Sequence, residues 1–545
     1  MGDEINNFSA RSLQPSFFSP ISSARSLPLD VFNPKPAVFN SKLASLQPEV
    51  FVFHTEVHPM LIYNQSLALL TDLYQLTMAY GYWKSGIGQK EATFHLFFRK
   101  NPFNGGYCVA AGLAHVITLL QHFKFDASDV DYLASLTGRD GNPLFEDKFL
   151  QYLQEMSFSC DLDAVPEGTI VFPSEPLIRI QGDIIQTQIL ETALLNIINF
   201  QSLIATKAAR VCMAAEGEPV LEFGVRRAQG IDGGLAASRA AYIGGCAATS
   251  NVLAGKVYGI PVKGTHAHSW VMCFDDELEA FQTYAKAMPN NCVFLVDTYD
   301  TLEGVKKAIE VGKWLRSEGH EMIGIRLDSG DLAYLSIEAR KLLDEAGFPH
   351  ATIVASNDLD ETIINSLKQQ GAQIGMWGVG TKLITAYDQP ALGGVYKLSC
   401  IRDRDGEWHH RVKLSEQAIK ISNPGIQQVR RYFHNGESVA DVIYDVSTDL
   451  SSGCVMVDPM DMTRQKRLTA GTPFEDLLVP VFRNGSCVYQ NPPIAEIRAQ
   501  THQNLEKFHS GVKRFVNPHQ YPVGLEKSLH TLKTDLVLKA RGVKS

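Results

Sequence analysis

Residues 322–331 read Met-Ile-Gly-Ile-Arg-Leu-Asp-Ser-Gly-Asp, and they contain the pattern on which the fold depends. The apolar run 322–327 predicts a short buried strand, and a turn rich in aspartate and glycine follows it at once. A helical stretch then covers 335–346 and ends at Gly347, with Pro349 just beyond, as expected at a helix C-terminus. Strand, polar turn and helix in this order form one βα unit, which indicates a parallel sheet.

The same unit recurs along the middle third of the chain. Leu302, Val305 and Ile309 share one helical face, and Asp358 with Glu361 forms a D-x-x-E signal for the start of another helix. This alternation predicts an α/β fold, which we interpret as an incomplete TIM-like α/β barrel. A doubly wound open sheet is the main alternative, but no G-x-G-x-x-G follows the first strand and the Walker pattern is absent. The predicted strands are 220–223, 257–262, 292–296, 322–327, 352–355 and 374–377.

Each predicted strand is followed by a loop of unusual composition. In an α/β barrel, the loops at the carboxyl ends of the strands lie on one rim, where the active site forms. A single such loop is typically a turn or a helix cap, but six in the same position predict one shared site. The loops are Phe223-Gly-Val-Arg-Arg-Ala-Gln-Gly230, Gly264-Thr-His-Ala-His-Ser269, Asp297-Thr-Tyr-Asp300, Arg326-Leu-Asp-Ser-Gly-Asp331, Ser356-Asn-Asp358 and Gly378-Val-Gly-Thr-Lys382.

Two kinds of loop residue suit a phosphorylated substrate. The backbone N–H groups of Gly378, Gly380 and Thr381 can surround a phosphate, although a glycine turn into a helix has the same sequence. Aspartates supply the oxygen ligands that Mg²⁺ prefers when it carries a diphosphate. Their structural alternatives are helix caps and, for one of them, a salt bridge to Arg326 two residues earlier. The aspartates are Asp297, Asp300, Asp328 and Asp331.

Histidine and arginine pairs complete the set of candidates. His266 and His268 would share one face if the strand continued through the preceding residues, but no third zinc ligand is in view. Acid/base or nucleophilic chemistry is therefore favoured, with a hydrogen-bonded structural histidine as the alternative. Arg226 and Arg227 follow the ring of Phe223 and could hold a flat aromatic acid by stacking and carboxylate contact, unless they are a plain surface pair.

Composition narrows the class of protein. The 545 residues include 50 Lys plus Arg against 59 Asp plus Glu, a net charge of −9, so nothing suggests nucleic acid or an anionic membrane as a partner. Nine cysteines without a C-x-x-C pair favour a reducing, cytoplasmic location. No run of eighteen apolar residues predicts a membrane span. Residues 1–66 are rich in Ser, Pro, Phe and Asn, and we interpret them as a flexible or dimer-wrapping extension.

Taken together, the motifs resemble the nicotinate phosphoribosyltransferases, within the type II phosphoribosyltransferases. The resemblance runs from about residue 67 to the C-terminus and is weaker after about residue 401. It is carried by Leu70-Thr-Asp-Leu-Tyr-Gln-Leu-Thr-Met-Ala-Tyr80, Phe97-Phe-Arg-Lys-Asn-Pro-Phe103, Glu222-Phe-Gly-Val-Arg-Arg-Ala-Gln-Gly230, Gly264-Thr-His-Ala-His-Ser269, Arg326-Leu-Asp-Ser-Gly-Asp331 and Gly393-Gly-Val-Tyr-Lys397.

The resemblance implies a domain plan. The barrel would span 181–395, next to a β-rich domain built from 67–180, which also contains helices, and from 396–545, which ends in a helical region. It also implies a homodimer whose active sites are completed across the interface by Tyr74 and Arg99.

The resemblance further implies a role for each site residue. Tyr74 and Phe223 would sandwich the pyridine ring, and His268 would be phosphorylated by ATP. Arg326 would contact the substrate carboxylate and, with Asp328 and His268, form the catalytic set. The remaining substrate-binding set is Arg226, Arg227, Ser250, Thr265, Ser356, Asn357, Gly378, Gly380 and Thr381; Arg99 and Lys397 would bind phosphate, and Asp297 and Asp328 would hold Mg²⁺.

The implied reaction joins nicotinate to 5-phosphoribosyl 1-diphosphate with ATP and water, giving nicotinate mononucleotide, diphosphate, ADP and phosphate. It requires Mg²⁺ or Mn²⁺. The loop Ala248-Thr-Ser-Asn-Val252 has no carboxylate, whereas nicotinamide-specific relatives place an aspartate there, and Ser250 can donate to the acid. The alternatives are a sister enzyme that acts on nicotinamide or quinolinate, and a catalytically silent paralogue that binds nucleotide. A silent copy should have lost His268, Arg326 or Asp328, and all three are present.

Overall fold

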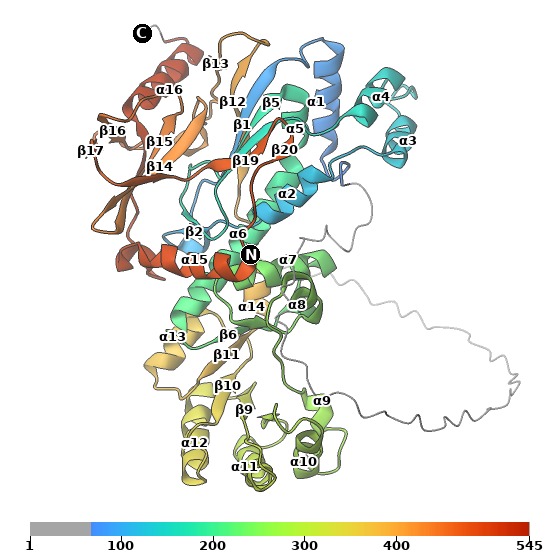
Figure 1. Cartoon of the computed structure of the whole chain (residues 1–545), viewed down its shortest axis with the longest axis vertical. Coiled ribbons are helices and arrows are strands. Elements are labelled where there is room, and N and C mark those ends of the chain that lie inside the picture. The colour runs from blue at the N-terminus through green and yellow to red at the C-terminus, as the bar shows by residue number, and fades with distance from the viewer. Residues whose placement is uncertain (1–66, 544–545) are drawn as a thin grey trace, which may run out of the picture. The chain divides into compact units, whose positions relative to one another are not determined.

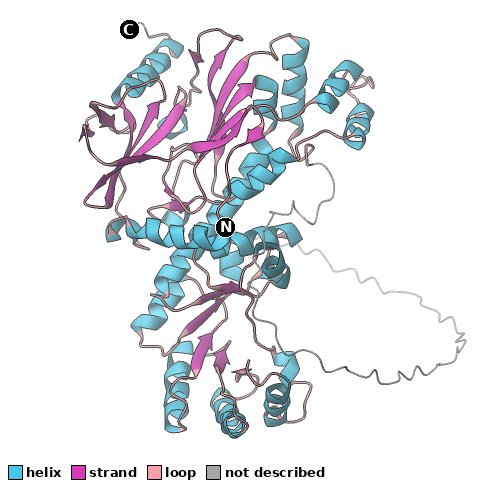
Figure 2. Ribbon diagram, viewed as in Figure 1, coloured by secondary structure: helices cyan, strands magenta, loops and turns pink. Residues whose placement is uncertain are grey.

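The computed structural model describes residues 67–543, so the predicted extension 1–66 lies outside the described residues. The described chain combines one six-stranded parallel sheet with two mainly antiparallel sheets of seven and six strands and a small two-stranded one. Figures 1 and 2 show helices packed around these sheets. The chain is therefore a mixed α/β protein with a β-rich C-terminal region.

The seven-stranded antiparallel sheet joins segments that are far apart in the sequence. Its first strand, β1, pairs with β5 on one side and with β12 on the other, so that Glu91 lies opposite Arg402 and forms an ion pair with it at 2.6 Å. In spatial order the strands are β13 (His409–His410), β12 (Val395–Arg402), β1 (Glu91–Phe97), β5 (Ile178–Asp183), β3 (Asp161–Ala164), β19 (Val479–Arg483) and β20 (Ser486–Cys487).

The second antiparallel sheet is formed entirely by the C-terminal region. In this sheet only β15 and β21 pair in parallel. An ion pair between Arg431 and Asp441 lies fully buried within it, and the Tyr521 hydroxyl donates to the same carboxylate at 2.9 Å. In spatial order the strands are β17 (Gln465–Thr469), β16 (Gly453–Val457), β21 (Val523–Glu526), β15 (Glu437–Asp445), β14 (Gln427–His434) and β18 (Phe474–Asp476), with helices α15 (Ile494–Glu506) and α16 (Lys527–Ala540) beside them.

The parallel sheet carries the loops that the sequence singles out. β6, the first strand of this sheet in the sequence, pairs in parallel with β11, the last one. The spatial order of the strands is β7 (Ala248–Thr249), β6 (Val220–Glu222), β11 (Met376–Val379), β10 (Thr352–Ala355), β9 (Gly324–Leu327) and β8 (Val293–Leu295). The helices between these strands are α7 (Gly230–Ile243), α8 (Val252–Tyr258), α9 (His268–Val271), α10 (Glu277–Ala287), α11 (Thr301–Ser317), α12 (Leu332–Glu345), α13 (Glu361–Gln369) and α14 (Thr381–Ile384).

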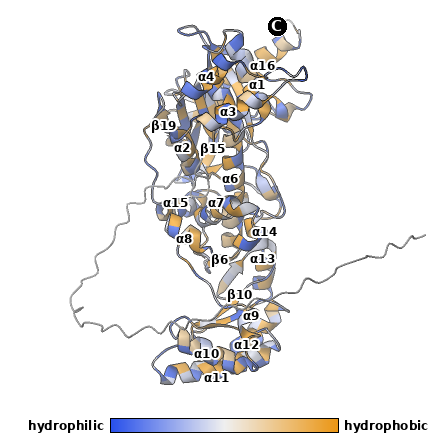
Figure 3. Cartoon of the chain, turned by 90° about the vertical axis from the view of Figure 1, so that its right-hand side faces the viewer, coloured by the Kyte–Doolittle hydropathy of each residue, from blue (hydrophilic) through white to orange (hydrophobic). Residues whose placement is uncertain are grey.

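Amphipathic helices cover this sheet. Val305 and Ile309 of α11 are buried, as their shared face predicts. Figure 1 shows α10, α11 and α12 next to one another, close to β9 and β10. In Figure 3 these helices carry hydrophilic and hydrophobic residues together, as expected for helices with one face in water and one in the core.

Two of the predicted element boundaries are wrong. The strand predicted at 257–262 does not form, because 257–258 belong to the end of α8, which the Asn251 side chain caps by accepting a hydrogen bond from the Ala254 N–H, and 259–261 form a loop. Only Val262 keeps a bridge, to Thr249 of β7. The start signal at Asp358 and Glu361 is displaced too, since Asp360 caps α13 by accepting from two backbone N–H groups. The other five predicted strands overlap β6, β8, β9, β10 and β11.

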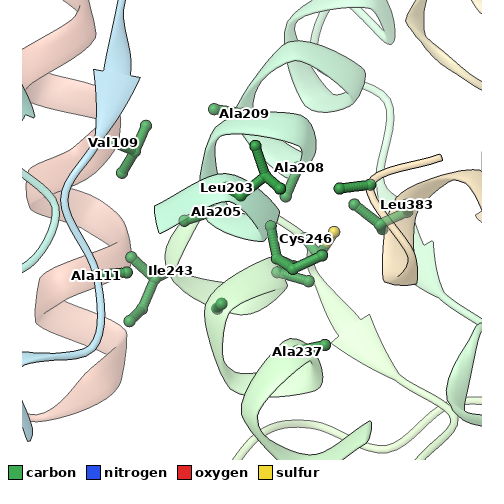
Figure 4. Packing of buried hydrophobic residues seen from close by; sticks show 14 of the residues in the cluster. Val109, Ala111, Leu203, Ala205, Ala208, Ala209, Ala237, Ile243, Cys246 and Leu383 are labelled. Carbon is green, nitrogen blue, oxygen red and sulfur yellow. The ribbon is translucent and has the colours of Figure 1, made fainter. Parts of the chain in front are cut away.

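The long helix α6 (Glu191–Ala214) joins the parallel sheet to the N-terminal segments. It packs against α7 so closely that a Cβ at Gly244 would lie 2.3 Å from the Ala205 carbonyl oxygen. Figure 4 shows Ala205, Ala208 and Ile243 in this contact. The remaining elements are α1 (Leu73–Lys84), β2 (Cys108–Val109), α2 (Leu113–Gln121), α3 (Ala127–Ser135), α4 (Asp147–Glu155), β4 (Ile170–Val171) and α5 (Ile184–Ile189). None of the helices in residues 67–543 is long and apolar enough to cross a membrane.

Candidate active site

Arg326 lies at the centre of a cluster formed by the strand ends of the parallel sheet. Its Nε donates to Ser356 Oγ at 2.8 Å, its Nη1 to Thr265 Oγ1 at 3.0 Å and its Nη2 to Asp328 Oδ1 at 2.9 Å. Only 13% of the side chain is exposed. The guanidinium group therefore holds residues from three loops in fixed positions.

Asp328 accepts hydrogen bonds from two of these partners. Its Oδ1 accepts from Ser356 Oγ as well as from Arg326. Burial alone would raise the pKa of Asp328, but the Ser356 hydroxyl and the Arg326 guanidinium outweigh it, and the pKa is lowered. The carboxylate is thus ionised at neutral pH.

Asp297 sits behind this carboxylate. Its Oδ2 accepts from the Asp328 backbone N–H at 2.8 Å and from Ser329 Oγ at 2.6 Å. Its Oδ1 is buried without a hydrogen-bond partner in the described part of the chain. A buried carboxylate oxygen without a donor is costly, so this atom is suited to hold a cation.

Asp300 and Asp331 have structural roles. Asp300 accepts from the Glu303 N–H and caps α11, and Asp331 accepts from the N–H groups of Ala333 and Tyr334 and caps α12. The cap interpretation of these two aspartates is thus confirmed. Residues 67–543 contain no cluster of three or more His, Cys, Asp or Glu side chains that could hold a metal ion.

The two histidines do not share a face, contrary to the alternation of the sequence. His266 is buried, and its Nε2 accepts from the Leu295 N–H at 3.3 Å. Burial lowers the pKa of His266 to about 4, so its ring is neutral. His268 instead begins α9 and is half-exposed, with Nδ1 3.1 Å from Thr298 Oγ1 and Nε2 3.7 Å from Asp328 Oδ2. The strand does not continue through these residues, and for this reason the two rings have different surroundings.

Phe223 forms an apolar wall beside Arg326. It follows β6, its N–H donates to the Val379 carbonyl at 2.9 Å, and the Arg326 guanidinium carbon is 5.8 Å from its ring centroid. A Cβ at Gly378 would lie 2.8 Å from the Phe223 ring, and one at Gly380 would lie 3.2 Å from the Phe223 carbonyl oxygen. A side chain at Gly378 would therefore force the Phe223 ring to shift, and one at Gly380 would be tight against the Phe223 backbone.

Glu222 is a site residue that sequence reasoning missed. It is fully buried at the end of β6, and it accepts from the Gly224 N–H, from Ser238 Oγ at 2.9 Å and from Thr249 Oγ1 at 2.6 Å. Its backbone carbonyl accepts from the Ser250 N–H at 2.9 Å. One carboxylate thus ties the turn after Phe223 to the loop that carries Ser250. The sequence signal that could have revealed this residue is a glutamate in an otherwise apolar strand.

A second missed link joins the loops after β10 and β11. Lys382, next to Thr381 at the start of α14, forms an ion pair with Asp360 at 2.7 Å. Asn357 has a φ of 93°, and its Oδ1 accepts from the next backbone N–H, so the loop after Ser356 is tightly turned. The loops that contain Ser356 and Thr381 are therefore braced against each other.

Five predicted site residues lie outside this cluster. Tyr74 is exposed on α1 and lines a hollow of about 360 Å³ together with Glu191 of α6. Lys397 of β12 is 3.9 Å from Glu191, and Arg99 follows β1. Arg226 and Arg227 are exposed in a short turn after Phe223. Within the described part of one chain, these side chains form no hydrogen bond or ion pair with the Arg326 cluster.

Comparison with known proteins places the whole described chain in one family. Residues 69–199, 220–436 and 426–533 match the N-terminal domain, the family region and the C-terminal domain described as nicotinate phosphoribosyltransferase (NAPRTase). The chain is 47% identical to the nicotinate phosphoribosyltransferase of Bacillus subtilis (strain 168), over 85% of this chain and 94% of the relative. It is 34% identical to that of Homo sapiens, over 86% of this chain and 96% of the relative.

Solved structures agree with this result. The crystal structure of human nicotinic acid phosphoribosyltransferase matches with a TM-score of 0.75 and 31% identity, covering 86% of this chain and 99% of that chain. The nicotinate-nucleotide pyrophosphorylase of Pyrococcus furiosus shares the fold, with a TM-score of 0.61 at 22% identity, covering 85% and 99%. On its sequence and on its structure, the chain belongs to the nicotinate phosphoribosyltransferase family.

Proposed function

We propose that the Arg326 cluster is the site at which this enzyme transfers a phosphoribosyl group to the ring nitrogen of nicotinate. The observation that carries the proposal is the number of N–H donors that the Arg326 guanidinium still has free. It has five N–H donors, and Thr265, Ser356 and Asp328 take three of them in the described structure. Two remain beside the ring of Phe223, which suits a flat aromatic carboxylate.

The phosphorylated substrate, 5-phosphoribosyl 1-diphosphate, would lie along the neighbouring loops. The backbone N–H groups of Gly378, Gly380 and Thr381 are proposed to hold its 5′-phosphate, and Ser356 with Asn357 its ribose. Arg226 and Arg227 follow Phe223 in an exposed turn and are proposed to assist at the phosphates and the ring. The tight glycine loop favours this arrangement, because nothing larger than hydrogen fits at Gly378.

Catalysis would consist mainly of positioning and of charge. As the diphosphate leaves, positive charge builds on the ribose, and the ionised Asp328 carboxylate stabilises it in a site with little water. Arg326 keeps the ring acid in line with the anomeric carbon. Asp297 and Asp328 fit a Mg²⁺ or Mn²⁺ ion because Asp297 has a buried oxygen without a donor. Such an ion would neutralise the leaving diphosphate.

His268 is proposed to couple ATP to this transfer. Its Nδ1 is placed to donate to Thr298 Oγ1, which leaves the lone pair of Nε2 for the γ-phosphorus of ATP. ADP would leave, and water would later take the phosphoryl group from the histidine. His266 cannot replace it, because its Nε2 is occupied by the Leu295 N–H.

A homodimer would complete the site. Tyr74, Arg99 and Lys397 carry side chains that suit a pyridine ring and phosphates, yet they lie on the N-terminal and post-sheet segments, away from the Arg326 cluster of the same chain. We propose that they reach the Arg326 cluster of a second copy. The exposure of Tyr74 beside a hollow supports this proposal.

We also propose a barrel form for the parallel sheet and a cellular location for the protein. The parallel sheet is proposed to be an incomplete TIM-like barrel, since β6 and β11 are neighbours and Val262 extends the edge at β7, leaving one gap before β8. A cytoplasmic location is proposed because all nine cysteines are free thiols.

One incubation tests the function. The purified chain is mixed with nicotinate, 5-phosphoribosyl 1-diphosphate, Mg²⁺ and ATP, and nicotinate mononucleotide is measured by chromatography. We expect the product to form, and to form faster with ATP than without it. Nicotinamide and quinolinate serve as parallel substrates, and a product from one of these alone would overturn the proposal. A chain that binds nucleotide but forms no product would be the silent paralogue.

A further inference from the structure

A cavity of about 600 Å³ lies in the β-rich region, apart from the Arg326 cluster. Its walls come from the segment after β1, from the loop before β14, and from β16, β17, β21 and α16. None of the residues of the Arg326 cluster lines it. Volumes of this size are typical of small-molecule sites.

Two lysines face this cavity without a carboxylate partner. Lys533 of α16 donates to the Asn423 side-chain oxygen at 2.8 Å, and Lys466 of β17 donates to the Val439 carbonyl at 2.7 Å. Neither lysine has an ion pair with another described residue. Burial lowers the pKa of Lys533 to about 8 and also lowers the pKa of Lys466.

The rest of the lining is also short of negative charge. Asp458 is the one acidic side chain among the described lining residues, and its Oδ1 already accepts from the N–H groups of Met460 and Asp461. Arg464 also lines the cavity and forms an ion pair with Asp461 at 3.3 Å, and the Nε of Arg99 is buried with no hydrogen-bond partner in residues 67–543. Lys466 and Lys533 are half-buried and have no carboxylate partner, so they give the cavity a positive charge that a bound anion can neutralise.

Another part of the lining, which we call the apolar wall, consists of apolar side chains. Phe97, Phe172, Ile443 and Met456 line it, and the Phe172 ring stacks on Tyr521 with centroids 4.3 Å apart. Ammonium groups act as point charges for phosphate, and an apolar, partly aromatic wall suits a ring or a base. The two walls together match a molecule with a charged and an apolar end.

We propose that this cavity binds a small phosphorylated metabolite of nucleotide size, at a site separate from the Arg326 cluster. Lys466 and Lys533 bind the phosphate groups, and the wall that contains Phe172 contacts the ring or base. Arg99 has been proposed to serve the active site of a second copy, so the argument rests on the two lysines. The proposal holds whichever substrate the Arg326 cluster takes.

Binding by the full chain tests the proposal. ATP, nicotinate mononucleotide and inorganic triphosphate are titrated separately by calorimetry into the unmodified chain, the Arg326→Ala chain and the Lys466→Met/Lys533→Met chain. We expect at least one probe carrying a ring or base to keep binding in Arg326→Ala and to bind about tenfold or more weakly in the double lysine variant. Methionine keeps most of the apolar stem of lysine and removes its charge, together with the hydrogen bonds to Asn423 and Val439. Lys527→Met/Lys539→Met, which alters two exposed lysines of α16 outside the cavity, is the matched control and should bind as the unmodified chain does.

Measurements of kcat, KM and Tm distinguish the possible outcomes of the binding experiment. The double lysine variant should retain kcat and KM for nicotinate within about twofold in the absence of added probe, and its Tm should change little because both lysines are half-buried and neither has an ion pair. Equal binding by the double variant and the unmodified chain would overturn the proposal, as would a probe site that holds inorganic triphosphate alone. Loss of both binding and turnover with an unchanged Tm would make the cavity part of the active site, which also overturns it.

Discussion

The Arg326 guanidinium donates to Asp328 Oδ1 at 2.9 Å, and the two residues lie at the same strand end. Ser356 donates to the same carboxylate oxygen and accepts from Arg326, so the three groups form a closed triangle. This triangle keeps the plane of the guanidinium fixed. The remaining donors of Arg326 are therefore ordered before any substrate arrives, which reduces the entropy lost on binding.

Arg326→Ala should reduce kcat/KM for nicotinate by about 100-fold or more, because a charge-assisted pair is lost and the Asp328 carboxylate keeps no cation. Steady-state kinetics with varied nicotinate measure this effect. Arg316→Ala, which removes an exposed arginine paired with Glu321, is the control and should change kcat/KM less than about twofold. Near-normal kinetics for Arg326→Ala would exclude the carboxylate role.

His268→Ala should abolish the stimulation by ATP and leave slow transfer without ATP, because substrate positioning survives loss of the phosphate acceptor. The comparison is the initial rate with and without ATP, together with acid-labile labelling of the chain by ATP. Full ATP stimulation in this variant would refute the assignment.

His266→Ala should act on stability instead of on ATP coupling. The change leaves the Leu295 N–H buried without an acceptor and removes a ring packed against Tyr284, so the free energy of unfolding should fall by about 1–3 kcal/mol. Denaturant unfolding measures it. An unaltered stability combined with lost ATP stimulation would reverse the roles of the two histidines.

Ser250→Asp should weaken the preference for nicotinate over nicotinamide. The new carboxylate would face an ionised acid in a poorly solvated pocket, where like charges repel, whereas the amide can donate to it. The ratio of kcat/KM for the two substrates is the measurement, and we expect it to fall by about tenfold or more. Ser250→Asn, which matches the size of aspartate without its charge, is the control. If the unmodified chain used both substrates equally well, the idea would fail before any variant was made.

Mixing two inactive chains tests the shared site. Tyr74→Ala and His268→Ala homodimers are expected to exchange subunits and give heterodimers with one intact site, so part of the ATP-stimulated activity should return. Subunit exchange is verified independently with differently tagged chains. If exchange occurs and no activity returns, Tyr74 does not act across an interface.

Most strands of the parallel sheet could be predicted from local sequence, and one predicted strand could not be confirmed. β10 is a short, largely apolar run, and β9 is apolar apart from Arg326; polar turns bound both, so local composition locates them. The strand predicted at 257–262 failed because Asn251 caps a helix and Gly259, with a φ of 70°, ends it, and this local signal outweighed the β-branched residues.

In the candidate site, too, some features could be predicted from the sequence and others could not. Its residue types were predictable because loops after parallel strands converge on one edge. The pairing of Arg326 with Ser356 and Thr265, residues 30 and 61 positions away, depends on the spatial order of the strands, which no local pattern specifies. The same is true of Glu222, whose three donors come from different elements.

The pairing of β1 with β12 affects how the molecule assembles. Glu91 meets a partner 311 residues later, so during synthesis this strand leaves the ribosome long before its neighbour exists. The parallel-sheet segment lies wholly between the two and uses shorter-range contacts, so it can fold first and bring the distant ends together. Until β12 arrives, the edge of β1 is open, and a nascent chain halted at this stage would be prone to aggregate and would need a chaperone.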